Sequence, residues 1–156
     1  MNKIIKKEEL EVIVDELKRK GKRVVFTSGC FDIIHAGHVM YLSEAREKGD
    51  VLVVLLNSDL SVKNLKGSKR PIVPENERAY VLAGLESVSF VCLFDDDTPC
   101  SIIRRIKPDV VVKGGDYKGK YIPEMDTVSE YGGVVDYVHL KEGWSTTNII
   151  EKIRSL

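Results

Sequence analysis

Five short apolar runs alternate along the chain with segments of helical spacing, and this alternation limits the possible fold more than any other feature. The run over 50–56, DVLVVLL, is almost wholly apolar, which is typical of a strand covered on both faces. The other predicted strands cover residues 23–27, 88–94, 109–112 and 134–138. Strands that alternate with helices imply right-handed crossovers, so the sequence predicts an α/β fold built on a parallel sheet.

Apolar residues three and four positions apart mark the helices between these runs. Residues 7–20 have this spacing, and Gly21 supplies a C-terminal stop. The remaining predicted helices cover residues 36–48, 77–85, 99–106, 124–131 and 146–154. The polar stretches 57–76 and 113–123 are predicted as long loops, a kind of segment that is often functional. We therefore expect a Rossmann-like, doubly wound sheet of about five strands with helices on both faces.

Composition narrows the classes of function. With 156 residues, 43% of them apolar, we expect one domain over 1–156, with an N-terminal helix over 1–21 and an α/β core over 22–156. Lysine plus arginine number 24, as do aspartate plus glutamate, so we expect neither nucleic acid nor membrane as a partner. The charged N-terminus and the lack of a run of roughly 20 apolar residues predict a cytoplasmic protein.

The segment SGCFDIIHAGH over 28–38 lies between the first predicted strand and the helix that follows it. His35 and His38 are three positions apart on an opening helical turn, so they face the same side. Unpaired backbone N–H groups and the helix dipole favour a phosphate there, and Gly37 lets it approach the backbone. The imidazoles can donate to phosphate oxygens as negative charge develops on them. The alternative is that they are surface or capping histidines.

Two further stretches offer charged residues to the same region, and the first of them is rich in glycine. Residues 114–120, GGDYKGK, match part of a P-loop, but Tyr121 stands where Ser or Thr should bind Mg²⁺. We instead expect Lys113 and Asp116 to present a cation and a carboxylate to one cleft.

The basic stretch over 63–71 offers cations to a triphosphate, unless its lysines are simply solvated. Lys66 is next to Gly67, so we expect it on a mobile segment that closes over the phosphates. Arg78 lies on a predicted helix and is suited to a fixed, bidentate contact with a phosphate. Ser145, Thr146 and Thr147 form an N-cap pattern and predict a second phosphate site.

Four segments in order, GCFDIIHAGHVMYL, LKGSKRPIVPENER, VKGGDY and EGWSTTNII, resemble the cytidylyltransferase-like nucleotidyltransferases. The resemblance runs from about Arg23 to Ile153. It implies in-line attack of a sugar 1-phosphate on the α-phosphorus of ATP, with Mg²⁺ on the phosphates and pyrophosphate as the leaving group. The match is nearest to members that form ADP-heptose from D-glycero-β-D-manno-heptose 1-phosphate for the lipopolysaccharide core. The alternatives are another small phosphate as acceptor, such as glycerol 3-phosphate or FMN, with ATP or CTP, and a nucleotide-binding module without turnover.

The resemblance also implies roles for single residues. It implies catalytic roles for His35, His38 and Lys66, and a positioning role for Asp32, whose alternative is a turn cap. It implies a nucleotide site made of Cys30, Phe31, Gly37, Arg78, Lys113, Gly115, Asp116, Ser145, Thr146 and Thr147, with no side chain bound directly to Mg²⁺.

Two questions stay open in the sequence. Leu140 and Lys141 stand where related glycerol-phosphate cytidylyltransferases carry an arginine, which weakens the CTP and glycerol alternative. Trp144 either stacks on the base or covers the core. A homodimer is a further expectation, with the apolar region 81–90 as a candidate contact.

Overall fold

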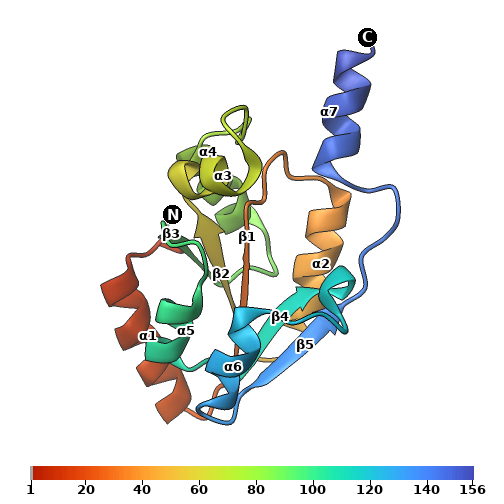
Figure 1. Ribbon diagram of the computed structural model, residues 1–156. Coiled ribbons are helices and arrows are strands. Elements are labelled where there is room, and N and C mark those ends of the chain that lie inside the picture. Colours follow the sequence, from red (N-terminus) through yellow and green to blue (C-terminus); the bar gives the residue numbers. More distant parts are fainter. Residues whose placement is uncertain (1) are drawn as a thin grey trace.

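Five parallel strands form the centre of the computed structural model, which describes residues 2–156 (Figure 1). They are β1 (Val24–Gly29), β2 (Val51–Asn57), β3 (Phe90–Phe94), β4 (Val110–Gly114) and β5 (Val134–Val138). Their order is β3-β2-β1-β4-β5, and each neighbouring pair is parallel. The predicted Rossmann-like sheet is therefore confirmed.

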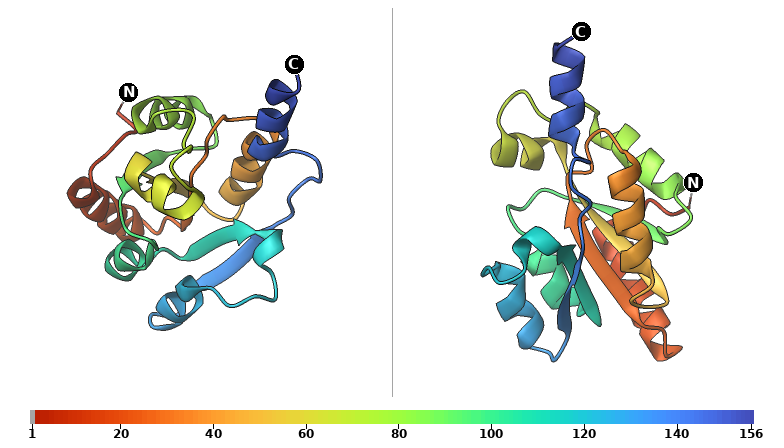
Figure 2. Two further views of the ribbon diagram at one scale, coloured as in Figure 1. Left: turned by 45° about the horizontal axis from the view of Figure 1, so that its top comes forward. Right: turned by 90° about the vertical axis from the view of Figure 1, so that its right-hand side faces the viewer.

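Helices cover both faces of this sheet, as predicted (Figure 2). They are α1 (Lys7–Arg19), α2 (Ala36–Arg46), α3 (Asp59–Lys66), α4 (Glu75–Gly84), α5 (Cys100–Ile106), α6 (Pro123–Ser129) and α7 (Thr146–Arg154), with a 3₁₀ turn, η1 (Gly115–Tyr117). Because successive strand side chains point to opposite faces, β1 contributes to two cores. Val24 and Phe26 pack with residues of α1, α5 and α6, whereas Val25 packs with residues of α2 and α4.

The path of the chain places a ligand site at one edge of the sheet. From the central β1 the chain moves outward through β2 and β3, and then crosses over to β4 on the other side of β1. Open α/β sheets bind ligands beyond the carboxyl ends of their strands, where the order reverses in this way. The segment with the two histidines follows β1, and the segment with Asp116 follows β4, so both start from this point.

The prediction of one continuous loop over 57–76 was wrong, because residues 59–66 form α3. Ser58 caps this helix, since its side-chain oxygen accepts a hydrogen bond from the backbone N–H of Ser61 at 3.2 Å. Gly67 follows the helix with φ at 94°, a conformation that favours glycine. The Ser-Asp pair was the N-cap signal, and the polar composition of the stretch obscured it.

The last helix, α7, extends away from the body of the molecule (Figure 1). None of its residues is buried, and Ile153 is 61% exposed. Neither α7 nor any other helix within residues 2–156 is long and apolar enough to cross a membrane.

Candidate active site

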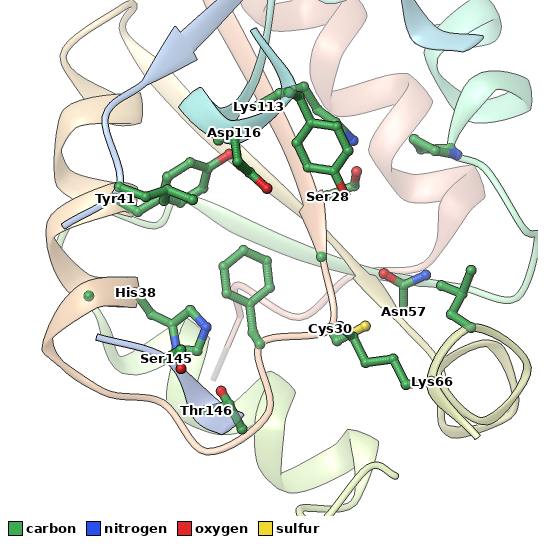
Figure 3. Close-up of a pocket in the computed structure, with 18 of the residues that line it drawn as sticks. Ser28, Cys30, His38, Tyr41, Asn57, Lys66, Lys113, Asp116, Ser145 and Thr146 are labelled. Carbon is green, nitrogen blue, oxygen red and sulfur yellow. The ribbon is translucent and has the colours of Figure 1, made fainter. Parts of the chain in front are cut away.

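A pocket of about 700 Å³ is lined by segments that follow the strand ends (Figure 3). The predicted site residues that line it are Cys30, Phe31, His35, Gly37, His38, Lys66, Lys113, Asp116, Ser145, Thr146 and Thr147. Three others, Asp32, Gly115 and Arg78, are not among its lining residues. The pocket thus unites segments that are more than 100 positions apart in the sequence.

His35 can use the two nitrogens of its ring for two different contacts. It is the N-cap of α2, and its Nδ1 accepts a hydrogen bond from the backbone N–H of Gly37 at 3.1 Å. Since Nδ1 is an acceptor there, the neutral ring carries its proton on Nε2, which can donate to a phosphate oxygen. A Cβ at residue 37 would lie 2.8 Å from this ring, so glycine is needed for the ring to fold back. The capping alternative is therefore compatible with phosphate binding.

His38 lies against His35, with ring centroids 4.0 Å apart. Its Nδ1 is buried and has no hydrogen-bond partner within the described residues 2–156, so Nε2 is the nitrogen left to meet a ligand. Burial, with a smaller contribution from the neighbouring His35, lowers the pKa of His38 to about 4. Burial lowers the pKa of His35 as well. At neutral pH the pair therefore offers uncharged N–H donors before a phosphate arrives.

This electrostatic environment predicts how His38 titrates. In the ligand-free protein, we expect its ring to titrate near pH 4, and we expect ATP to raise this midpoint because a nearby anion favours the imidazolium. The unfolded chain, with a His pKa of about 6.5, binds more protons between these values. His38 therefore contributes less to stability as the pH falls from about 6.5 toward 4. NMR of the histidine rings, assigned with His38→Gln, measures both midpoints; a free-state value near 6.5 contradicts this prediction.

Lys113 and Glu124 form a buried ion pair in the pocket wall. The Nζ of Lys113 donates to Oε1 of Glu124 at 2.7 Å, and the two side chains are only 13% and 5% exposed. The same Nζ lies 5.2 Å from the centre of the Tyr117 ring. Because its charge is already balanced, Lys113 supplies less free positive charge to the pocket than its sequence position indicated. Sequence reasoning missed Glu124, although an acidic residue in the first turn of α6 is a recognisable feature.

Tyr41 was also missed, and it fixes α2 to the sheet. Its hydroxyl pairs with Oγ1 of Thr27 at 2.7 Å and donates to the carbonyl of Val112 at 3.2 Å. Burial raises the pKa of Tyr41. Its position three residues after His38, on the same helix face, was the available signal. The bonds connect the helix that carries the histidines with β1 and β4.

The structure does not bring the Asp32 carboxylate to the pocket. Its side chain is fully buried and accepts hydrogen bonds from Nε of Arg70 at 2.7 Å and from the backbone N–H groups of Ile72 and Val73. Burial alone would favour the protonated acid, but these bonds lower the pKa of Asp32. With its oxygens so occupied, Asp32 holds the segment over 70–73 against the segment 28–38 that carries the histidines, instead of contacting substrate. This role is closer to the turn-cap alternative.

Arg78 also differs from expectation, because its guanidinium is buried and engaged within the protein. It donates to the backbone carbonyls of Val73, Cys30 and Asn57 at 2.6–2.9 Å and to Asp59 at 2.8 Å. Arg78 is 1% exposed, so its guanidinium does not reach a bound triphosphate. It instead holds the surrounding backbone segments in place.

Gly115 does not line the pocket, and a Cβ there would approach the carbonyl oxygen of Val138 at 3.2 Å. Its place in the predicted nucleotide site is taken by Gly114, which does line the pocket.

The first turn of α7 closes the pocket beside the histidines (Figure 3). Ser145 is its N-cap and accepts a hydrogen bond from the N–H of Asn148 at 3.1 Å, while Thr146 donates to the carbonyl of Asp32 at 2.7 Å. Trp144 lines the pocket, is 41% exposed and lies 4.3 Å from Nζ of Lys141. A helix start with hydroxyl side chains is well suited to bind a phosphate.

Comparisons with known proteins place the chain among nucleotidyltransferase relatives. The model of the cytidylyltransferase-like family matches residues 26–153. The chain is 55% identical over 148 residues to the bifunctional protein HldE of a Nitratiruptor species, and 53% identical over 153 residues to that of Geotalea uraniireducens. These alignments cover 95% and 98% of the chain but 31% of each relative, so the chain spans about a third of the length of the curated relatives it matches.

A solved structure shares the fold. The crystal structure of the lipopolysaccharide core biosynthesis protein from Thermoplasma volcanium aligns with a TM-score of 0.63 and 30% sequence identity. The alignment covers 78% of this chain and 98% of that one.

Proposed function

We propose, because the chain belongs to the cytidylyltransferase-like family, that it transfers AMP from ATP to D-glycero-β-D-manno-heptose 1-phosphate, forming ADP-heptose and pyrophosphate. The observation that carries the proposal is the adjacent pair His35 and His38, in one pocket with Lys66 and residues 145–147. The relative from Thermoplasma volcanium is described as a lipopolysaccharide core biosynthesis protein, which supports a sugar phosphate as the acceptor.

The proposed reaction is a single in-line displacement. An oxygen of the acceptor phosphate attacks the α-phosphorus, and the bond to the bridging β-oxygen breaks, so that pyrophosphate leaves with the electron pair. Negative charge grows on the non-bridging oxygens, where Nε2–H donors of His35 and His38 stabilise it. Lys66 and the hydroxyl residues 145–147 hold the departing phosphates. Catalysis of this kind consists of positioning and charge stabilisation, so it needs no covalent intermediate.

The nucleoside fits the side of the pocket at the end of β4. The Asp116 carboxylate lies there with Lys113 and Tyr41 (Figure 3). A carboxylate at this place can accept hydrogen bonds from ribose hydroxyls, as in other doubly wound nucleotide-binding folds. The exposed ring of Trp144 gives the base a surface for stacking.

The donor set is compatible with Mg²⁺ that arrives with ATP. Among residues 2–156, no group of three or more His, Cys, Asp or Glu side chains could hold a metal ion. Mg²⁺ usually keeps several waters and binds through substrate phosphates, so a pocket rich in cations and hydroxyls suits this mode. When bound, it would neutralise charge on the phosphates.

Two finer features belong to the same proposal. We propose a cytoplasmic location, where ATP is supplied. We also propose a homodimer, for which exposed apolar side chains give support: Ile153 on α7 is 61% exposed and Val81, in the region 81–90, is 44% exposed. Light scattering after gel filtration gives the oligomeric state directly, and a monomer at micromolar concentration contradicts the dimer.

Pyrophosphate release tests the proposed reaction. The protein, ATP and Mg²⁺ are incubated with heptose 1-phosphate, and mass spectrometry identifies ADP-heptose. Parallel reactions contain CTP in place of ATP, or glycerol 3-phosphate or FMN in place of the sugar phosphate. Pyrophosphate release that requires heptose 1-phosphate supports the proposal. Release with another acceptor alone means that the acceptor is a different phosphate. No release with any acceptor means that the protein binds nucleotide without turnover.

Lys66→Ala tests whether Lys66 binds a phosphate of ATP or only stabilises the fold. Lys66 lines the pocket and is exposed, so its loss is expected to lower kcat/KM for ATP by about 10-fold or more, the range for a hydrogen bond to a charged group. The melting temperature should stay within about 2 °C, a change that corresponds to about 0.5–1 kcal/mol. Lys63→Ala, on the same helix but outside the pocket lining, is the matched control. A lower melting temperature with unchanged kinetics contradicts the assignment.

A further inference from the structure

We propose that Asp97 and Thr98, with Asn57 behind them, bind the sugar hydroxyls of the acceptor. This inference rests on the proposed function and adds a subsite to it. All three residues line the pocket, together with Phe94 and Pro99, yet none is needed for the phosphates or the nucleoside. They lie where β2 and β3 end, whereas the nucleoside is assigned to the end of β4.

The segment after β3 is held firmly at this edge. Asn57 and Phe94 are register partners at the ends of β2 and β3. The backbone N–H of Ser58 donates to the carbonyl of Phe94 at 3.0 Å, and the hydroxyl of Ser61 donates to the carbonyl of Asp96 at 3.4 Å. Asp97 therefore follows an anchored residue, and its position at the pocket is set by α3 as well as by β3.

The polar groups of this subsite are available to a ligand. The carboxylate of Asp96 accepts a hydrogen bond from Ser101, but within the described part of the chain no donor bonds to the Asp97 carboxylate or the Thr98 hydroxyl. Asn57 is buried and donates through Nδ2 to Ser61 at 2.9 Å. Figure 3 shows its amide oxygen on the pocket side, away from that bond. Carboxylate, hydroxyl and amide oxygens are suitable partners for a polyol, because each can accept from sugar hydroxyl groups.

Charge along the pocket orients the acceptor. Arg70 lines the pocket beside residues 28–38, which carry the two histidines, and within the described part of the chain its guanidinium bonds only through Nε, to the buried Asp32. A sugar 1-phosphate is anionic at one end and neutral along the rest of its length. Its phosphate is attracted to Arg70 and is repelled by Asp97, so the sugar lies toward β3. In-line attack requires the acceptor phosphate to approach the α-phosphorus opposite the departing pyrophosphate, so its sugar occupies a different part of the pocket from the nucleoside.

Asp97→Asn tests the subsite, and Asp95→Asn is the matched control. Both changes remove one exposed carboxylate from the same loop, but Asp95 does not line the pocket. We expect Asp97→Asn to raise KM for heptose 1-phosphate by about 10-fold or more, as for a lost hydrogen bond to a charged group, with KM for ATP unchanged. Thr98→Val should raise the same KM by a smaller factor, because it removes a neutral partner.

A binding measurement keeps this test separate from that of the reaction. Calorimetry measures the affinity of heptose 1-phosphate for each variant in the presence of a non-hydrolysable ATP analogue. If the unaltered protein binds the sugar phosphate through Asp97 but releases no pyrophosphate, the subsite stands and the proposed reaction fails. If it turns over and Asp97→Asn behaves like Asp95→Asn, the subsite is wrong and the reaction stands. An equal rise in KM for ATP also overturns the subsite.

Discussion

His38→Ala is expected to lower kcat about 10²- to 10³-fold, the loss seen when one donor to a developing negative charge is removed. The ring is uncharged in the free pocket and lies beside His35, so its hydrogen bond to a phosphate oxygen strengthens as charge accumulates in the transition state. KM for ATP should change by no more than a few-fold, because the ground state gains less from this contact.

Steady-state and single-turnover pyrophosphate assays measure this split between kcat and KM. His139→Ala is the control, since His139 is exposed and outside the pocket lining. If His38→Ala keeps normal turnover, the catalytic assignment fails; if only KM for ATP rises, His38 binds the ground state and does not favour the transition state.

Arg78→Met is expected to lower the free energy of unfolding by about 3–5 kcal/mol, because each buried carbonyl that loses its donor costs about 1–3 kcal/mol. The substitution leaves the carbonyls of Cys30, Asn57 and Val73 without their buried donors, and Asp59 without its cation. Urea unfolding followed by circular dichroism measures the loss.

Lys66→Met serves as the control for Arg78, because it also replaces a cation by methionine but changes an exposed side chain. Its unfolding curve should match that of the unaltered protein. Arg78→Lys should recover only part of the stability, since one ammonium cannot reproduce the planar set of donors. If Arg78→Met leaves the unfolding curve unchanged and lowers only the affinity for ATP, Arg78 contacts a phosphate, and its buried hydrogen bonds contribute little to stability.

The elements were largely predictable because their signals are local. The uninterrupted apolar run of β2 and the spacing in α1 each specify an element without knowledge of its neighbours. The pair His35 and His38 was predictable for the same reason, since the two residues are three positions apart on one turn. Its place in one site with residues 145–147 was implied by the resemblance to the cytidylyltransferase-like family.

The roles of Asp32 and Arg78 depend on contacts that sequence spacing does not reveal. Both are charged residues near a motif, and a charge near a motif favours a ligand contact. Whether the side chain faces solvent or the protein interior depends on segments 38 to 48 positions away, which here supply Arg70, Ile72, Val73 and Cys30 as partners. Asp97 escaped notice for the opposite reason. It stands in an ordinary acidic loop, and only the alignment of β3 with β2 brings it to the pocket.

The strand order has a consequence for how new specificities could arise. The two histidines assigned to the chemistry follow β1, while the segment 95–98 follows β3, two strands away from β1. Replacing residues 95–98 could therefore change the preferred acceptor to another polyol phosphate, while the catalytic residues stay unchanged.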